Sequence, residues 1–401
     1  MSSSVIVIGA GAAGLVAAAW SARAGASTTL VERTHDGGRK ILISGGGRCN
    51  VLPSVLAPER FVTDSPPHML RGMLRSWPLH EQRAFFEHDL QLPLALEEES
   101  GKLFPASDRA RDVRDALVAH ARAVGVRMQF DTRVSDIIVN AGGFTVVTAA
   151  GNIEGRRLIL ATGGLSVPAT GSDGAGLEFA KRLGHLIVDP YPALTPLLGN
   201  GSHDGLAGVS LRVRLRAKTD QRTIEAEGGF LFTHRGYSGP AVLDISHLTS
   251  RGGQPTIRAQ WSDRTQQEWA SDFEAAGAAV STLLTRHIPS RLATRLMTEA
   301  SIPEDRRTSA LKRTERLALI EALTSYPLPW TGNEGYKKAE VTGGGVALSE
   351  VDAKTLESRR VPGLYLCGEM LDAFGPIGGH NFSWAWATGR AAGCAAGAER
   401  A

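Results

Sequence analysis

The chain has 401 residues, with 44 Lys and Arg against 41 Asp and Glu and a formal net charge of +3. Its 42% hydrophobic and 21% charged residues supply enough apolar surface to offset chain entropy, which excludes an intrinsically disordered protein, and no Lys/Arg-rich block indicates a nucleic-acid-binding tail. A chain of this length usually exceeds one hydrophobic core, so we expect a main domain with one or two smaller ones.

The cysteines and one apolar segment indicate the cellular compartment of the protein. Cys49, Cys367 and Cys394 are too few and too far apart for a disulfide framework or a CxxC metal or redox site, which predicts a reducing compartment and no metal. The apolar start from Val5 to Trp20 lacks the basic segment of a signal peptide and is interrupted by three glycines. No later stretch is long enough to span a membrane, so we predict a cytoplasmic protein.

The first elements have the order strand, glycine turn, helix, strand. A β-branched run from Ser4 to Ile8 leads into the turn Gly9–Gly14, an alanine-rich helix to about Ala24, and a second strand from Thr28 to Val31. Glu32 follows about twenty residues beyond the turn, where a ribose-binding acid belongs. This order predicts a dinucleotide-binding βαβ unit rather than a plain structural turn.

The chemistry of the turn explains the prediction. Its glycines let the backbone approach a pyrophosphate, and the helix start supplies unpaired N–H groups and a positive dipole. This motif alone leaves NAD and FAD open as the cofactor. The predicted dinucleotide-binding residues here are Gly9, Gly11, Ala12, Ala13, Gly14 and Glu32.

Further elements follow in order. Leu79–His88 and Asp112–Gly125 have helical spacing, and from Pro190 onward prolines and the alternating run Val209–Leu215 predict a β-rich insert with one solvent-facing side. Residues 264–325 have a helical pattern, and the last elements are a strand near Gly363–Cys367 and a helix over about Phe382–Ala396. Other predicted strands are Arg127–Asp131, Val134–Val139, Phe144–Thr148 and Arg157–Ala161.

These boundaries predict three domains. Residues 1–190 and 340–401 form a discontinuous dinucleotide-binding domain, residues 191–263 and 326–339 a β-rich insert, and residues 264–325 a small helical insert.

Three features favour FAD. First, cations and flexible backbone follow the ribose acid. Second, a glycine turn follows a strand that comes after a β-meander. Third, a glycine-rich segment opens the last helix, whose N–H groups and dipole would stabilise negative charge at flavin N1/O2. Gly368–Glu369 and Asp372 would bind ribityl hydroxyls. The corresponding predicted FAD-binding residues are Arg33, Gly38, Arg39, Lys40, Ala161, Thr162, Gly163, Gly164, Gly368, Glu369, Asp372, Gly379, His380 and Asn381.

Longer motifs carry a family resemblance. The segments GGRKILISGGGRCN (37–50), GGFLFTHRGYSGPAVLDIS (228–246) and GLYLCGEMLDAFGPIGGHNFSWAWATG (363–389), with Gly101–Pro105, Gly171–Gly176 and Val341–Val346 between them, resemble the BaiN/RdsA-like (YhiN-type) flavoproteins essentially end to end. The predicted FAD-binding set also contains Ser44, Gly45, Gly46, Val134 and Phe382.

The resemblance implies a fold and an activity. It implies an α/β protein with a Rossmann-like, glutathione-reductase-like FAD domain interrupted by a β-barrel-like insert and a helical insert. It also implies flavin-dependent reduction of a C=C bond, which members of the family carry out in steroid-like enones or in a uridine of ribosomal RNA, as a dihydrouridine synthase does. This chain departs from frequent family residues at Val51–Pro53 and at His380, which stands where a tyrosine is common.

A mechanism follows as a hypothesis. No second GxGxxG follows another strand, so we expect no permanent nicotinamide site and only transient docking of NAD(P)H. NAD(P)H gives hydride to flavin N5 and leaves. The reduced flavin then passes hydride to a polarised double bond. Cys49 is the candidate proton donor, with Arg48 holding an anionic or carbonyl group and His380 an alternative acid. Packing roles for Cys49 and His380 are the competing interpretations, and Cys367 and Cys394 are read as packing residues.

Other functions remain open. An aromatic hydroxylase would have Gly-Asp at the position of Gly368–Glu369, and a flavin-containing RNA-binding or redox-sensing module would lack reductase turnover. Arg235 and Tyr237 either face a flavin cleft or pin two domains together. The substrate, a small molecule or RNA, stays undecided, as do the choice between NADH and NADPH and the oligomeric state, and no obligate protein partner is evident.

Overall fold

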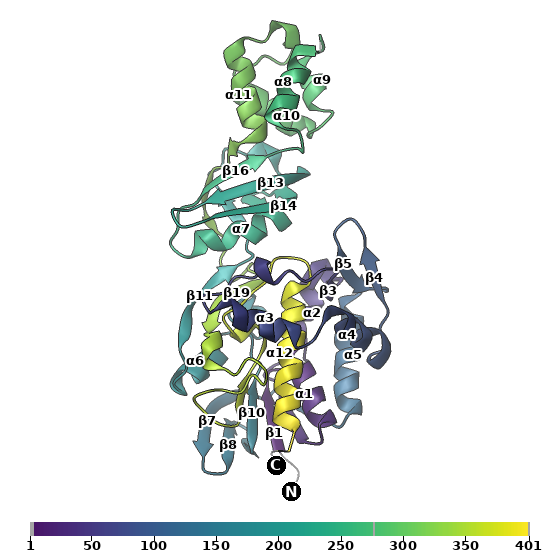
Figure 1. Cartoon of the computed structure of the whole chain (residues 1–401), viewed down its shortest axis with the longest axis vertical. Helices are drawn as coiled ribbons and strands as arrows, with labels where there is room; N and C mark the ends of the chain where they lie inside the picture. Colours follow the sequence, from purple (N-terminus) through teal and green to yellow (C-terminus); the bar gives the residue numbers. More distant parts are fainter. Residues whose placement is uncertain (1–3, 276, 400–401) are drawn as a thin grey trace. The chain divides into compact units, whose positions relative to one another are not determined.

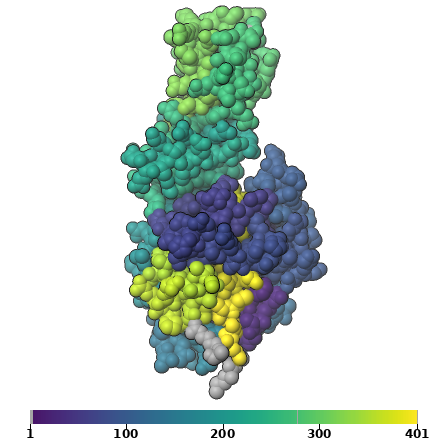
Figure 2. Space-filling view, in the orientation of Figure 1, coloured from purple at the N-terminus to yellow at the C-terminus, as the bar shows by residue number. Residues whose placement is uncertain are grey.

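The computed structural model describes residues 4–275 and 277–399. It divides the chain into two compact units, of which the first comprises Met1–Pro192 with Glu340–Ala401 and the second, the inserted unit, comprises Ala193–Ala339 (Figure 1). In the space-filling view, yellow residues from the end of the chain lie against purple and blue residues from its beginning (Figure 2). The first unit is therefore discontinuous in sequence.

A five-stranded parallel sheet organises the first unit. Its strand order is β20-β10-β1-β2-β6, and every neighbouring pair is parallel. The short β-branched and leucine-rich runs are buried on both faces, as parallel strands usually are. The prediction of a Rossmann-type domain is confirmed. The strands are β1 (Ser4–Ile8), β2 (Ser27–Val31), β6 (Arg127–Gln129), β10 (Arg157–Leu160) and β20 (Leu364–Leu366).

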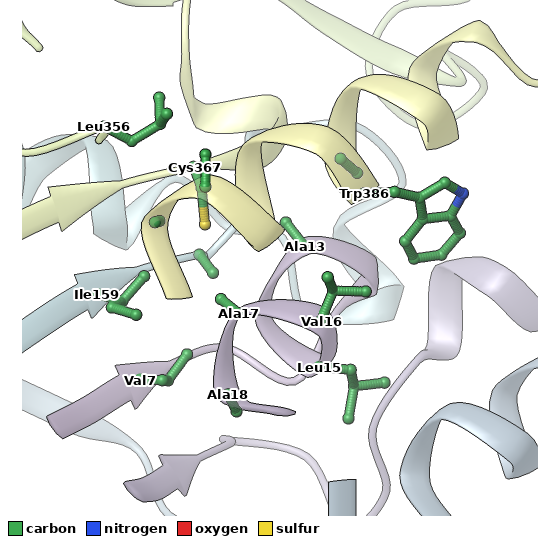
Figure 3. Packing of buried hydrophobic residues seen from close by; sticks show 14 of the residues in the cluster. Val7, Ala13, Leu15, Val16, Ala17, Ala18, Ile159, Leu356, Cys367 and Trp386 are labelled. Carbon is green, nitrogen blue, oxygen red and sulfur yellow. The ribbon is translucent and has the colours of Figure 1, made fainter. Parts of the chain in front are cut away.

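Two helices from opposite ends of the chain pack along each other over this sheet. They are α1 (Ala12–Arg23) and α12 (His380–Gly397). Glycines recur every fourth residue on α12, and a Cβ placed at Gly389 would come within 2.5 Å of the carbonyl oxygen of Ala13. Figure 3 shows Ala13 and Ala17 on the side of α1 that faces the yellow helix. Small residues on both sides therefore allow a close approach, in which the first turn of α1 lies beside the middle of α12.

The remaining elements of the first unit surround this core. The helix predicted over Leu79–His88 is α-helical only to Ala84 and continues as a π-helical turn over Phe85–Asp89. Strand β9 (Gly151–Gly155) was not predicted, because its polar sequence becomes a strand only by pairing with β8. The other elements are α2 (Arg39–Ile43), β3 (Leu52–Pro53), α3 (Pro67–Arg75), α4 (Leu79–Ala84), β4 (Leu94–Glu97), β5 (Lys102–Pro105), α5 (Ala110–Ala123), β7 (Val134–Asn140), β8 (Gly143–Thr148), α6 (Ala175–Arg182), β11 (Ile187–Ala193) and β19 (Val341–Val346).

The inserted unit is built on a seven-stranded antiparallel sheet. Its order is β17-β16-β13-β14-β15-β12-β18, and helix α7 (Pro240–Ser250) packs on β13 and β14. Alternate residues of β13 are buried and exposed, so the expectation of one solvent-facing side is confirmed. The strands are β12 (Leu197–Gly199), β13 (Ser210–Lys218), β14 (Thr223–Phe232), β15 (Gly236–Ser238), β16 (Thr256–Gln260), β17 (Tyr326–Pro327) and β18 (Trp330–Asn333).

Among the described residues between β16 and β17, four α-helices follow one another, as the helical pattern of residues 264–325 predicted. They are α8 (Gln266–Ala275), α9 (Val280–Leu284), α10 (Ser290–Glu299) and α11 (Arg313–Thr324). Buried side chains of these helices, such as Trp269 and Leu319, belong to the same hydrophobic cluster as Val213 and Phe230 of the sheet. The division of this unit into a β-rich and a helical domain stays a prediction.

Neither unit contains a membrane-crossing helix within residues 4–275 and 277–399, since none there has the required length and apolarity. Over the same residues, no three side chains of His, Cys, Asp or Glu are grouped so that they could hold a metal ion.

Candidate cofactor and active site

A cavity of about 520 Å³ opens in the first unit beside the carboxyl ends of β1, β2 and β10. This is the edge at which open parallel sheets bind ligands. The cavity reaches from the first turn of α1 to the first turn of α12. Most of the predicted FAD-binding residues line it, namely Gly9, Gly11, Ala12, Ala13, Glu32, Arg33, Gly38, Arg39, Lys40, Ser44, Gly45, Gly46, Val134, Ala161, Thr162, Gly163, Gly368, Glu369, Gly379, Asn381 and Phe382.

Four predicted FAD-binding residues lie behind the cavity wall. A Cβ at Gly14 would overlap the carbonyl oxygen of Gly9, and one at Gly164 would overlap the Thr342 side chain, so both glycines permit close packing. Asp372 is 2% exposed and His380 is 5% exposed, and neither lines the cavity.

The α1 end of the cavity is made of backbone. Gly9 has φ +102°, a left-handed conformation that favours glycine, and Gly11 is the residue before the first turn of α1. No atom lies within 4 Å of a Cβ placed at Gly11, and the first turn of α1 contains no acidic residue. The first N–H groups of the helix, which have no partner within the helix, are therefore available to an anion.

Glu32 is held in place beside this turn. Its Oε2 accepts a hydrogen bond from the backbone N–H of Ala10 at 2.8 Å, and its Oε1 accepts from the N–H and the hydroxyl of Thr34 at 2.9 and 2.8 Å. A carboxylate has about four acceptor sites, so roughly one remains for a ligand hydroxyl. The carboxylate thus links the end of β2 to the glycine turn.

An ion pair crosses the middle of the cavity. Lys40 of α2 donates to Glu369 at 2.6 Å and also to the Ser166 hydroxyl, which in turn donates to Glu369. The other contact of Glu369 is the N–H of Thr342, at 3.0 Å. Segments far apart in sequence are joined here by charge-assisted hydrogen bonds, which are about twice as strong as neutral ones.

The cations that line the cavity differ in their partners. Arg33 and Arg133 pair with Asp173, Arg39 pairs with Asp36, Lys40 with Glu369, and Arg48 with Glu97 and Asp108. The ammonium group of Lys102 on β5 has neither an ion pair nor a hydrogen bond to any residue in the described ranges. Its Cε lies 3.7 Å from the point where a Cβ of Gly378 would be. Lys102 lines the cavity and lies in the family motif Gly101–Pro105, but the sequence patterns did not predict it as a cavity residue.

The Arg48 guanidinium already contacts three side chains of the protein. It donates to Asp108 at 2.9 Å and to Glu97 at 3.0 Å, and its guanidinium lies 3.9 Å from the centre of the Phe104 ring. Its predicted role, holding an anionic or carbonyl group, would compete with these contacts.

Cys49 lies beside Arg48 but is completely buried and does not line the cavity. Burial raises the pKa of its thiol to about 12, so the thiol is neutral at pH 7. It has φ 61°, in the left-handed region. The sequence did not predict this left-handed backbone conformation.

His380 is the first residue of α12. Burial lowers the pKa of its imidazole to about 4, although the backbone carbonyls of Ile377 and Val55 oppose this, so the ring is neutral at pH 7. The edge of the ring packs against Phe61, with centroids 6.0 Å apart.

The α12 end of the cavity is a braced glycine turn. Gly378 and Gly379 have φ +117° and +87°. Asn381 accepts from the N–H of Gly375 at 2.8 Å and donates to its carbonyl at 2.9 Å, which fastens the turn. The helix that follows has 18 residues and no acid in its first turn, so its N–H groups and dipole favour negative charge.

Arg235 and Tyr237 lie in the inserted unit and not in the wall of the cavity. Arg235 pairs with Glu334 at 3.0 Å, and the Tyr237 hydroxyl, buried in the inserted unit, donates to the carbonyl of Pro329 at 2.8 Å. Neither is among the residues that line the cavity.

Two buried polar atoms in the cavity wall favour an extended polar ligand. Oγ1 of Thr162 and Oδ1 of Asn50 have no hydrogen-bond partner within the described part of the chain, although both residues line the cavity. Buried polar atoms are rarely left unpaired. The hydroxyls and ring N–H of FAD would satisfy them, and the α1 amides would hold its pyrophosphate, so the residues fit this cofactor.

The parallel sheet, the glycine turn and the cavity together define a Rossmann-type FAD-binding oxidoreductase. The family model described as the HI0933-like protein Rossmann domain matches residues 3–395. The chain therefore belongs to the HI0933-like family of FAD-dependent oxidoreductases, in agreement with the resemblance seen in the sequence.

Named relatives extend this result. A ribosomal RNA dihydrouridine synthase of Escherichia coli is 34% identical over 392 residues, covering 96% of this chain and 95% of the relative. A 3-dehydro-bile acid delta(4,6)-reductase of Clostridium scindens is 32% identical, with 98% of both chains covered. A solved structure of E. coli quinol fumarate reductase FrdA covers 99% of this chain and 70% of its own at 14% identity, with a TM-score of 0.50, which shows the fold alone.

Proposed function

We propose that this oxidoreductase takes hydride from NAD(P)H and uses it to reduce an activated C=C bond, either in a uridine of RNA or in an enone-type small molecule. The relatives that support the proposal are named for these two substrate classes. When bound, FAD supplies the hydride acceptor and donor. The observation that carries the proposal is the Lys102 ammonium, which lies at the α12 end of the cavity. Among the described residues it has no hydrogen bond or close ion pair, and its nearest electrostatic partner is Glu97, directly opposite on β4, which Arg48 already binds.

The chemistry of an activated C=C bond explains why that cation matters. Hydride that adds to the β-carbon leaves negative charge on the carbonyl oxygen of the substrate. A positioned ammonium group stabilises this charge more in the transition state than in the ground state. Lys102 would supply this charge, while Arg48 holds β4 and the segment beyond β5 at the cavity edge through Glu97 and Asp108.

A proton must also reach the α-carbon. Cys49 and His380 remain the candidate donors; a thiol with a pKa of about 12 and a neutral imidazole each carry a proton at pH 7. Both lie behind the cavity wall, so a donor role requires a side-chain rotation. Serine and alanine variants of Cys49 and a glutamine variant of His380 would separate these roles by their effect on substrate reduction.

The proposal is tested with anaerobic half-reactions. Purified protein with bound FAD is mixed with NADH or NADPH, and loss of the visible absorbance of oxidised flavin is followed. The reduced protein is then mixed with uridine-containing RNA or with a panel of enones. We expect reduction by one nicotinamide and reoxidation by one substrate class, with dihydrouridine or the saturated ketone as product.

Two results would contradict the proposal. Flavin that stays oxidised under both nicotinamides would remove NAD(P)H as the reductant. RNA binding that persists in Cys49→Ala, without any turnover of the wild-type protein, would favour a flavin-containing RNA-binding or redox-sensing module. Cys49, Cys367 and Cys394 are all free thiols, and we propose the reducing cytoplasm as the place of action.

A further inference from the structure

One face of the inserted sheet is strongly cationic. Along β13 the exposed residues alternate with Val213, Leu215 and Ala217, which are buried in the core of the inserted unit. Successive side chains of a strand point to opposite faces, so the exposed ones share one surface at intervals of about 7 Å. We call this surface the β13 basic face; its cations are Arg212, Arg214, Arg216 and Lys218 of β13 and Arg258 of β16.

Carboxylates neutralise only part of this charge. Glu227 of β14 is shared by Arg212 at 3.0 Å and Arg214 at 3.3 Å, and these arginines lower its pKa. Glu225 lies 3.6 Å from Arg216, which is itself directly opposite Arg258. Five cations thus face two carboxylates on the three strands.

The cross-strand arrangement has a cost for the fold. Like charges directly opposite each other destabilise a sheet, and Arg216 and Arg258 occupy such positions. Arg258 has Glu321 at 3.8 Å, and Lys218 has no acidic partner among the residues with described positions. An anion that binds across the strands would offset this repulsion.

The wider charge distribution points the same way. Residues 193–339 contain 19 Lys and Arg against 15 Asp and Glu, whereas the whole chain has a net charge of only +3. The excess positive charge of the protein therefore resides in the inserted unit. Clefts and faces of one sign raise the local concentration of partners of the opposite sign.

The β13 basic face has no aromatic side chain. Its other residues are Ser210, Thr223, Gly229, Leu231, Thr256 and Gln260. Proteins that bind single-stranded bases stack them on aromatic rings, and sequence is read at base edges. A face of arginines and small residues fits phosphates, not bases.

We propose that the β13 basic face binds the phosphodiester backbone of RNA without reading its sequence. This inference rests on the proposed function in one respect, because it names RNA as the substrate class that the cavity serves. Backbone contacts on the inserted unit would supply affinity, and the cavity of the first unit would select the uridine.

The test is a salt series of RNA binding. Full-length protein with bound FAD is titrated into a fluorescently labelled, uridine-containing RNA hairpin, and anisotropy is measured between 50 and 200 mM salt, a range over which phosphate contacts change affinity strongly. The test variant is Arg214→Gln/Arg216→Gln. Losing two phosphate contacts should weaken binding about 10- to 30-fold and reduce the salt slope by about two.

Two control variants sharpen the test. Glu227→Gln on the same face should tighten binding about two- to fivefold, because it removes a competing carboxylate. Arg182→Gln removes an arginine of the first unit that is 57% exposed and paired with Asp136, and it should change binding less than about twofold. Circular dichroism and FAD content of each variant show that folding is intact.

Several outcomes overturn the inference. These are unchanged affinity in Arg214→Gln/Arg216→Gln, an equal loss in Arg182→Gln, weaker binding in Glu227→Gln, or a preference for one hairpin sequence over a shuffled one that is lost in the double variant. Failure of the proposed function is distinguishable from these, because it appears as absent flavin turnover with salt-dependent RNA binding still in place. Reduction of a small enone should be the same in wild type and the double variant.

Discussion

The two ends of the cavity are both helix starts, but they are built differently. At the α1 end the wall contains backbone from one continuous segment, Gly9–Ala13, and Glu32 is fixed beside it. At the α12 end the wall combines Gly378, Lys102 and Arg48, which come from three separate parts of the chain. The anion-binding part of the first end is backbone and local in sequence, whereas the second end is assembled by packing.

The difference separates a general function from a specific one. An amide-lined helix start recognises any pyrophosphate, so the α1 end identifies a class of cofactor. The α12 end has charge supplied by side chains, and under the proposed function these would select the substrate. Variants at each end should therefore fail in different assays.

The largest effect is expected from an acid at the α1 end. Gly11→Asp adds a side chain into open space, so the protein should fold, but its carboxylate would face the pyrophosphate of FAD. We expect the Kd for FAD to rise by at least about 100-fold. Ultrafiltration with flavin fluorescence measures it, and Gly11→Ala should change Kd far less. Equal FAD affinity in Gly11→Asp would show that the pyrophosphate lies elsewhere.

The second-largest effect is expected from the contact between α1 and α12, called the seam below. Gly393→Ala would place a Cβ against the carbonyl of Ala17, so α1 and α12 must move apart. We expect a loss of about 1–3 kcal/mol in the free energy of unfolding. Gly72→Ala, in the exposed interior of α3 with no atom within 4 Å, is the matched control and should stabilise by up to about 1 kcal/mol. Chemical denaturation that shows equal shifts would contradict this account of the seam.

A loss of charge at the α12 end should affect chemistry rather than cofactor content. In Lys102→Met, substrate reduction by the reduced protein should slow by about 10- to 100-fold, while FAD content and reduction by NAD(P)H stay close to wild type. Lys102→Arg should recover part of the rate. A substituted phenol added to the oxidised protein gives a second readout. If its phenolate contacts the Lys102 ammonium, its affinity should also fall in Lys102→Met. Equal phenolate affinity would remove Lys102 as the anion contact.

The smallest effect concerns pH and Asp372, which lies behind the α12 end. Burial raises the pKa of this carboxyl to about 6, against hydrogen bonds from Thr63, Asp64 and Ser65. The folded protein then binds more protons than the unfolded chain between about pH 4 and 6, so stability from this group falls as pH rises through that window.

Asp372→Asn keeps an acceptor oxygen but removes the titration. Its melting temperature should vary less between pH 4 and 7 than that of the wild type, by about 2–4 °C. An identical pH profile of the two proteins, measured by calorimetry, would contradict the raised pKa. FAD content serves as the control, because Asp372 does not line the cavity.

Much of the FAD-binding unit was predictable because its signals are local. The strand Ser4–Ile8, the turn after it and Glu32 follow one another in sequence, and hydrogen bonds over short separations keep them together. The family motifs extended this to the last helix. The same patterns did not reveal β9, which is polar and becomes a strand by pairing with β8, or the π-helical turn after Ala84.

The amino-acid sequence by itself determined the class of fold, the cofactor and the alternating solvent-facing strand of the insert, because these rest on period, glycine spacing and adjacent residues. Only the tertiary structure decided which side chains reach the cavity. It buried Cys49 and His380, occupied Arg48 with two carboxylates and left Lys102 without a hydrogen bond or close ion pair among the described residues. The physical reason is that burial and charge pairing are properties of the packed neighbourhood, which residues far apart in the chain create together.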